Sequence, residues 1–144
     1  MNLKVFLMLI IFNLLVSCSG GGNSSLKNEE KQIVPVILNI SPEEAYSKIL
    51  SNSNNPLFFI IDVRTSSEYA EGHIEKSTNI DYKSASFSTE INSFNKSNAY
   101  IIYCLSGGRS GSALKKMRAS GFLEVYNITG GITSWTTDSL PVIK

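Results

Sequence analysis

The chain has 144 residues, of which 42% are hydrophobic and 17% are charged, and its mean hydropathy is +0.02. This composition excludes a disordered chain and a membrane protein with several spans. Lys and Arg number 13 against 12 Asp and Glu, so the chain lacks the positive charge excess of nucleic-acid-binding proteins, and we expect no nucleic-acid partner. Two cysteines and one histidine exclude a four-cysteine iron–sulfur cluster and are too few for a Cys/His zinc site or a disulfide-stapled fold. One small globular domain fits this length.

Residues 1–17 have the features of a signal peptide. Lys4 precedes an apolar run at 5–16, which is shorter than the roughly 20 residues that a helix needs to cross a bilayer. The run ends in Leu-Val-Ser-Cys, which resembles the lipobox of bacterial lipoproteins. This resemblance implies cleavage before Cys18 and attachment of diacylglycerol and palmitate-type acyl chains to the protein, which give stable anchoring. The alternative is an ordinary secretory signal with an incidental cysteine.

A flexible tether is predicted at 18–33 and a folded domain at 34–144. The segment from Ser19 to Gln32 contains one large apolar residue, and a Gly-rich chain of this length reaches roughly 20 Å. Without Lys4, basic and acidic side chains are equal in number, so lipid rather than a basic surface would hold the domain to the membrane. We expect the protein in the bacterial cell envelope, facing the periplasm, at the outer membrane rather than the inner one.

Short apolar runs alternate with helical patterns along the domain. The strands are predicted at 33–40, 57–63, 78–80, 99–103 and 125–128. The helices are predicted at 41–50, 66–70, 86–94 and 110–120, with a short amphipathic segment around Trp135. The first helix is predicted to begin with a capping box formed by Ser41 and Glu44. This alternation predicts an α/β domain with a mostly parallel central sheet of about five strands.

Cys104 stands where the strand at 99–103 gives way to a Gly-rich loop and then to a helix. Ligands of open α/β sheets bind outside the carboxyl ends of the strands, and a helix N-terminus directs N–H groups and a positive dipole end into such a loop. Gly107 and Gly108 allow successive N–H groups to converge on an anion. These features stabilise a thiolate, so Cys104 is predicted to be a nucleophile of lowered pKa. The alternative is a buried structural cysteine before an ordinary turn.

The chain resembles the rhodanese family in three motifs that occur in the family's order. The loop residues that match the family pattern Cys-x-x-Gly-x-Arg-Ser are Cys104, Gly107, Arg109 and Ser110. The segment 61–74 resembles the family's Asp-Val-Arg…Glu-Tyr…Gly-His-Ile block, and 130–135 resembles its closing Gly-Gly…Trp. The chain departs from the family at 75–77, where Glu-Lys-Ser replaces Pro-Gly-Ala. The resemblance implies a three-layer α/β domain with helices on both faces of the sheet.

The resemblance also implies a sulfurtransferase that needs no metal or organic cofactor. The Cys104 thiolate would attack the outer sulfur of a donor such as thiosulfate, form a persulfide, and pass the sulfur to cyanide or a thiol in ping-pong fashion. Arg109 would orient the anionic donor or, alternatively, brace the loop against an acidic neighbour. The residues whose backbone N–H groups are expected to hold the persulfide are Leu105, Ser106, Gly107, Gly108, Arg109 and Ser110.

Two other functions remain open at this point. Four residues separate Cys104 from Arg109, whereas tyrosine phosphatases have five, so the resemblance implies a loop too tight for phosphate or arsenate and makes a phosphatase or arsenate reductase the less favoured alternative. The second alternative is a sulfur-relay module that binds sulfane sulfur without turnover. We expect the protein to be a monomer.

Four further residues are predicted to lie near the site in structural roles. Asp62 and Arg64 suit a charge pair that braces a loop, joined by Glu68. His73, the only histidine, suits a hydrogen-bonded framework role rather than that of a general base. No metal site is expected.

Overall fold

The computed structural model describes residues 32–144. The predicted signal peptide at 1–17, Cys18 and the tether up to residue 31 lie outside the described residues. The strands of the described part are β1 (Val36–Ile40), β2 (Phe58–Asp62), β3 (Ser77–Asn79), β4 (Ala99–Tyr103) and β5 (Glu124–Ile128). They form one sheet in the order β1-β5-β4-β2-β3, and each neighbouring pair is parallel.

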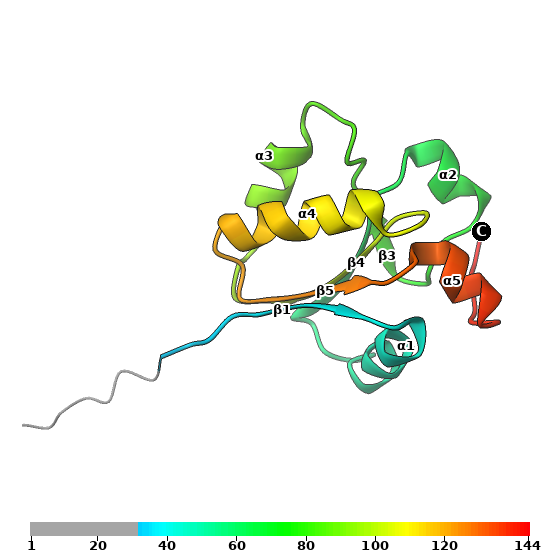
Figure 1. Cartoon of the computed structure of the whole chain (residues 1–144), viewed down its shortest axis with the longest axis horizontal. Helices are drawn as coiled ribbons and strands as arrows, with labels where there is room; N and C mark the ends of the chain where they lie inside the picture. The colour runs from blue at the N-terminus through cyan, green and yellow to red at the C-terminus, as the bar shows by residue number, and fades with distance from the viewer. Residues whose placement is uncertain (1–31) are drawn as a thin grey trace, which may run out of the picture. The chain divides into compact units, whose positions relative to one another are not determined.

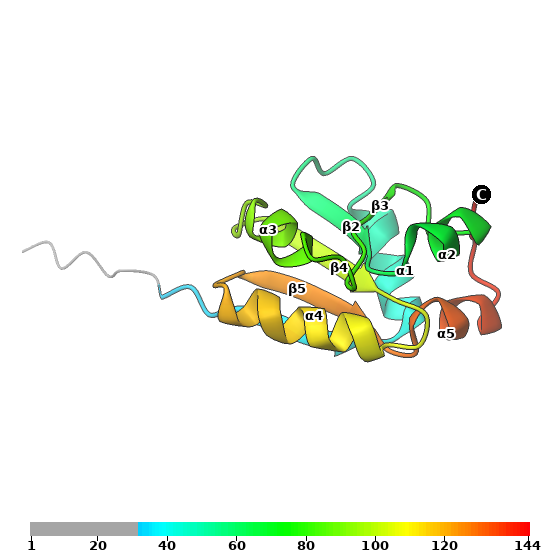
Figure 2. The ribbon, with the colours of Figure 1, turned by 90° about the horizontal axis from the view of Figure 1, so that it is seen from above.

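Helices cover both faces of the sheet, as Figures 1 and 2 show. The helices α1 (Pro42–Ser51) and α5 (Gly131–Thr137) pack on one face, and α3 (Phe87–Asn92) and α4 (Gly108–Ala119) pack on the other. The short helix α2 (Ser66–Glu71) lies beyond the end of the sheet toward which the strands run (Figure 1). The predicted α/β fold with a parallel sheet and helices on both faces is therefore confirmed.

The central strand β4 shows why its sequence is a continuous apolar run. Tyr100 and Ile102 belong to the core cluster under α3 and α4, whereas Ile101 and Tyr103 belong to the cluster under α1 and α5. All four side chains have 0% exposure. A strand that is covered on both faces has no solvent side, so it keeps no polar alternation.

Side-chain caps explain where two of the helices begin. Ser41 accepts a hydrogen bond from the Glu44 N–H, and the Glu44 carboxylate accepts one from the Ser41 N–H, which is the predicted capping box of α1. Thr65 and Glu68 form the same reciprocal pair at the start of α2. Each box satisfies backbone N–H groups that have no partner within the helix.

Some element boundaries differ from the sequence prediction. The helix predicted from residue 110 begins at Gly108, because Gly107 adopts a left-handed conformation (φ 95°) at the N-cap and turns the chain into α4 earlier. The strand predicted from residue 33 begins at Val36, after Pro35, which has no N–H to donate to a sheet.

Within residues 32–144, no helix has both the length and the apolar character needed to cross a bilayer.

Candidate active site

The loops that follow β2, β4 and β5 meet at one edge of the sheet, because the carboxyl ends of parallel strands lie together. Cys104 follows β4 directly, and the loop that it opens runs between α2 and α5, as both views in Figures 1 and 2 show. Asp62 ends β2, and Gly130 and Gly131 follow β5 closely. Three segments that are distant in sequence therefore form one site at the place where open α/β sheets bind ligands.

Cys104 is 1% exposed, and its sulfur is held by hydrogen-bond donors of the following loop. The Gly107 N–H donates to Sγ at 3.1 Å, and the buried hydroxyl of Ser110 donates at 3.4 Å. Burial raises the pKa of the Cys104 thiol, but the Ser110 hydroxyl and the N–H groups of Ser110, Ser106 and Gly107 outweigh burial and lower the pKa below its ordinary value. The arrangement favours a thiolate, and it can stabilise negative charge on sulfur.

The first turn of α5 fixes the other side of this loop. The Ile132 N–H donates to the Cys104 carbonyl at 2.9 Å, and the Thr133 N–H and hydroxyl donate to the Leu105 carbonyl at 3.0 and 2.8 Å. Gly131 has φ +59°, and a Cβ there would lie 2.3 Å from the Cys104 carbonyl oxygen. The sequence analysis identified this Gly-Gly pair only as part of a family motif and did not predict the contact, although two glycines between a strand and a helix were the available signal.

Arg109 ends the loop in a bidentate ion pair with Glu68 of α2. Its Nη1 and Nη2 atoms donate to the two Glu68 carboxylate oxygens at 2.7 and 2.6 Å. Thr65 donates to the same carboxylate through its N–H at 3.0 Å and its hydroxyl at 2.8 Å. The hydrogen bonds from Arg109 hold the pKa of Glu68 well below its usual range, and Glu68 in turn raises the pKa of Arg109. Arg109 is therefore braced by an acidic neighbour, and the charge of the Cys104 thiolate adds a smaller upward effect on the pKa of Arg109.

Asp62 and Arg64 form the predicted charge pair, and it is buried. Asp62 is 0% and Arg64 4% exposed, and the Arg64 Nη2 donates to the Asp62 Oδ2 at 2.6 Å and to the Gly72 carbonyl at 2.7 Å. Asn79 of β3 donates to the backbone carbonyls of both residues. Glu68 does not join this pair as the sequence suggested, because the Arg64 guanidinium already binds Asp62 and Gly72 while Arg109 binds Glu68.

His73 lies in the framework around the site, and among the described residues it has no hydrogen bond to Cys104. Its Nδ1 lies 3.1 Å from the Tyr69 carbonyl oxygen, and its ring stacks on Tyr69 with a centroid distance of 3.8 Å. Its backbone pairs with Ile143 in an isolated antiparallel bridge. His73 therefore connects the C-terminal segment to the region after α2.

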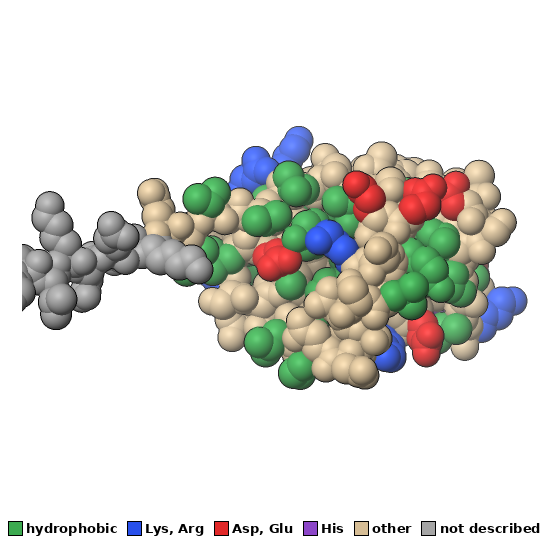
Figure 3. All heavy atoms as spheres, turned by 90° about the horizontal axis from the view of Figure 1, so that it is seen from below, with side chains coloured by type: hydrophobic (Ala, Val, Ile, Leu, Met, Phe, Trp, Pro, Cys, Tyr) green, Lys and Arg blue, Asp and Glu red, His purple; other side chains and the backbone are tan. Residues whose placement is uncertain are grey.

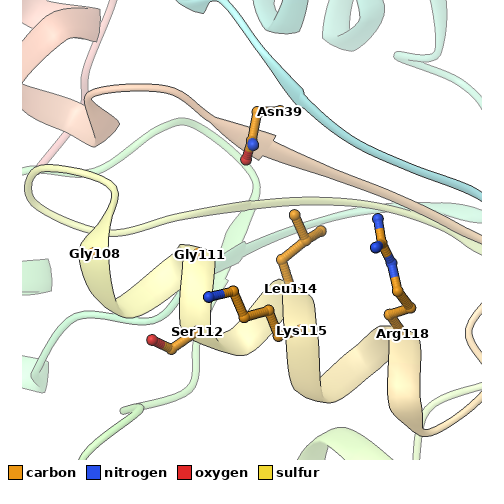
Figure 4. A pocket seen from close by; sticks show the side chains of 7 residues that line it. All are labelled: Asn39, Gly108, Gly111, Ser112, Leu114, Lys115 and Arg118. Carbon is orange, nitrogen blue, oxygen red and sulfur yellow. The ribbon is translucent and has the colours of Figure 1, made fainter.

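A hollow of about 330 Å³ lies beside α4. Figure 4 shows the described residues that line it, and none of them is a cysteine, an aspartate or a glutamate. Of the loop residues, only Gly108 lines it. Asn39 of β1 accepts a hydrogen bond from the buried Asn127 Nδ2 at 2.9 Å, and the Asn127 Oδ1 has no partner among the described residues.

Within residues 32–144, no group of three His, Cys, Asp or Glu side chains is placed to hold a metal ion.

A family model described as "Rhodanese-like domain" matches residues 41–138. The senescence-associated protein DIN1 of Raphanus sativus is 37% identical over 92 residues, which are 57% of this chain and 50% of that protein, so the chain spans about half the length of this relative. Thiosulfate sulfurtransferase 18 of Arabidopsis thaliana is 30% identical over 115 residues, which are 72% of this chain and 82% of that protein. A tRNA uridine(34) hydroxylase of Buchnera aphidicola is 32% identical over 106 residues, which are 67% of this chain and 32% of that protein.

A solved structure agrees with the family match. The crystal structure of a rhodanese-related protein from Thermoplasma volcanium superimposes with a TM-score of 0.63 at 26% identity. The match covers 73% of this chain and 96% of that chain.

Proposed function

Since the chain belongs to the rhodanese-like family, we propose that it is a sulfurtransferase, which moves a sulfane sulfur from a donor such as thiosulfate to a thiophilic acceptor. The observation that carries the proposal is the Cys104 sulfur at the end of β4, which receives hydrogen bonds from the Gly107 N–H and the Ser110 hydroxyl. A relative named a thiosulfate sulfurtransferase, of which the match covers 82%, supports the same reaction class.

In the proposed first half-reaction, the Cys104 thiolate attacks the outer sulfur of thiosulfate. The sulfur–sulfur bond of thiosulfate breaks, sulfite leaves with the bonding electrons, and a persulfide remains on Cys104. The N–H groups of the loop stabilise the negative charge on the terminal sulfur. The Arg109 guanidinium, whose charge Glu68 balances, has further N–H groups that can donate hydrogen bonds to the dianionic donor. In the second half-reaction, cyanide takes the terminal sulfur as thiocyanate and leaves the Cys104 thiolate, so the cycle balances without a metal or a redox cofactor.

Mass spectrometry of the thiosulfate-treated protein, followed by thiocyanate release with cyanide, tests this proposal. We expect an addition of about 32 Da, one sulfur atom, on the peptide that contains Cys104, and repeated turnover with cyanide. Cys104→Ser should lose both signals and keep its circular dichroism spectrum, because a hydroxyl fits the space of the thiol. Cys18→Ala, the matched control at the other cysteine, should keep both. Thiocyanate production by Cys104→Ser would overturn the proposal, and loading followed by a single discharge would make the protein a sulfur carrier.

We further propose that a lipid on Cys18 holds the protein to the membrane of the bacterial cell envelope, facing the periplasm. The support is the sequence alone: the apolar run at 5–16 ends in Leu-Val-Ser-Cys. Two or more acyl chains on one residue give stable anchoring, since each buried methylene contributes about 0.8 kcal/mol.

A further inference from the structure

A hollow of about 260 Å³ lies directly beside the loop that Cys104 opens. Its walls come from the end of α2, the loop residue Leu105, α5 and the C-terminal segment. Figure 1 shows the loop before α4 between α2 and α5, with the C-terminus close by. A molecule in this hollow would lie next to the residue that immediately follows the nucleophile.

Part of the wall is apolar and exposed. Leu105 and Val142 line the hollow and are 47% and 42% exposed, and Ile132 contributes a third aliphatic side chain. A ligand that covers large aliphatic side chains beside a buried nucleophile is bound more tightly, because each Å² of apolar surface removed from water stabilises the complex by about 25 cal/mol. The wall therefore fits a ligand with a small apolar body.

The charge of the hollow is negative. Arg64 lines it, but its guanidinium is bound to Asp62 and to the Gly72 carbonyl, so its charge is already neutralised. Glu71 also lines the hollow and has no ion pair among the described residues. Thr133 and Thr136 add neutral polar groups. The hollow therefore disfavours an anion, in contrast to the N–H groups that surround the Cys104 sulfur.

We infer that this hollow, lined by Glu71, Leu105, Ile132 and Val142, is the subsite for the sulfur acceptor and takes a small aliphatic thiol whose body is neutral or positively charged. The inference rests on the proposed function. In the step that it implies, the acceptor thiol first releases its proton to water, and its thiolate attacks the terminal sulfur of the Cys104 persulfide. The persulfide bond breaks, Cys104 leaves as a thiolate, and the acceptor becomes a persulfide, so no external oxidant or reductant is required.

Discharge of the sulfur-loaded, full-length protein by three thiols tests the inference. The thiols are 2-aminoethanethiol, 2-mercaptoethanol and 3-mercaptopropionate, which have short chains and carry a positive, a neutral and a negative group. Each thiol has its own intrinsic reactivity, which is the same toward every protein variant. The ratio of the rate constants for the cationic and the anionic thiol, compared between variants, therefore reports on the subsite.

Relative to wild type, Glu71→Lys should lower the cationic-to-anionic ratio by about tenfold, and Glu71→Gln by about threefold, as expected for interactions between partly solvated charges. Glu75→Gln, the matched control at an exposed carboxylate that does not line this hollow, should leave the ratio unchanged. An unchanged ratio in both Glu71 variants would overturn the subsite while leaving sulfur transfer intact. Failure of the wild-type protein to gain a sulfur atom would instead overturn the proposed function, and the subsite with it.

Discussion

At the scale of single residues, the reactivity of Cys104 depends on a competition between burial and hydrogen bonding. Burial alone would raise the pKa of this thiol and leave it protonated, as in most buried cysteines. The hydrogen bonds from the Ser110 hydroxyl and three backbone N–H groups outweigh burial, so the pKa of the Cys104 thiol lies below its ordinary value. The Ser110 hydroxyl is the one side-chain donor in this set, and substitution can remove it without changing the backbone.

Replacing Ser110 with alanine should therefore raise the pKa of Cys104. Loss of a hydrogen bond to the charged form disfavours the thiolate, so the acidic limb of the rate against pH should move to higher pH. The rate of alkylation by iodoacetamide as a function of pH measures this shift. Ser112→Ala, an exposed serine on the same helix, is the control and should leave the profile in place. Superimposable profiles for wild type and Ser110→Ala would contradict the role of the hydroxyl.

The ion pair between Arg109 and Glu68 predicts a pH-dependent stability. The pKa of Glu68 in the folded protein is lowered, first by Arg109, so its stabilising contribution is fully present above the ordinary Glu pKa and is lost as the pH falls below that value. Glu68→Gln should lower the free energy of unfolding by about 1 kcal/mol at neutral pH and by less at acidic pH. Urea denaturation at several pH values checks this, with Glu75→Gln as the exposed control. If the difference in the free energy of unfolding between wild type and Glu68→Gln grew toward acidic pH, this result would contradict the prediction.

At the scale of elements, the contact between α5 and the catalytic loop requires glycine at one position. Gly131→Ala would place a Cβ against the Cys104 carbonyl at φ +59°, and we expect a loss of about 3 kcal/mol or more of stability together with loss of sulfur transfer. Gly108→Ala is the matched substitution, because no atom lies within 4 Å of its Cβ position and its φ is not positive. Its free energy of unfolding should stay the same or rise by about 0.5–1 kcal/mol. Guanidinium denaturation of the two variants measures the contrast, and equal stabilities would contradict it.

The elements that the sequence predicted well are those whose signal is local. The apolar run of β4 and the Ser41 capping box of α1 depend on neighbouring residues only, and both occur where predicted. The start of α4 was placed two residues late, because the left-handed conformation of Gly107 is stabilised by the surrounding fold and leaves no periodic pattern. An acidic neighbour of Arg109 was among the predicted alternatives, but Glu68 was not identified as that neighbour, because the two residues are 41 positions apart and no local pattern connects them.

At the scale of the whole molecule, the order of the strands creates the site. Because β4 lies between β5 and β2, the loops after these three strands meet around Cys104, Gly131 and Asp62. The alternation of strands and helices predicts a parallel sheet, but it does not say which strands are neighbours. The prediction that Asp62 lies near the site rests on the family resemblance, and the strand order comes from the structure. The family resemblance supplied the motifs, and the strand order explains in physical terms why they act together.

The distribution of charge bears on how the whole protein attaches to a membrane. The described residues carry equal numbers of basic and acidic side chains. On the face that Figure 3 shows, the two signs are interspersed among apolar side chains rather than gathered into a basic surface. Electrostatic attraction of this face to anionic lipid is therefore weak, and the proposed lipid on Cys18 should account for nearly all of the attachment.

Full-length protein in a bacterial host that processes lipoproteins should accordingly fractionate with membranes. It should remain there in about 1 M salt, where the screening length falls to about 3 Å. Cys18→Ala should lose incorporation of labelled palmitate, while thiosulfate still adds one sulfur atom at Cys104, because the two cysteines serve separate tasks. Release of the wild-type protein by salt, or palmitate incorporation that persists in Cys18→Ala, would contradict attachment through a lipid on Cys18.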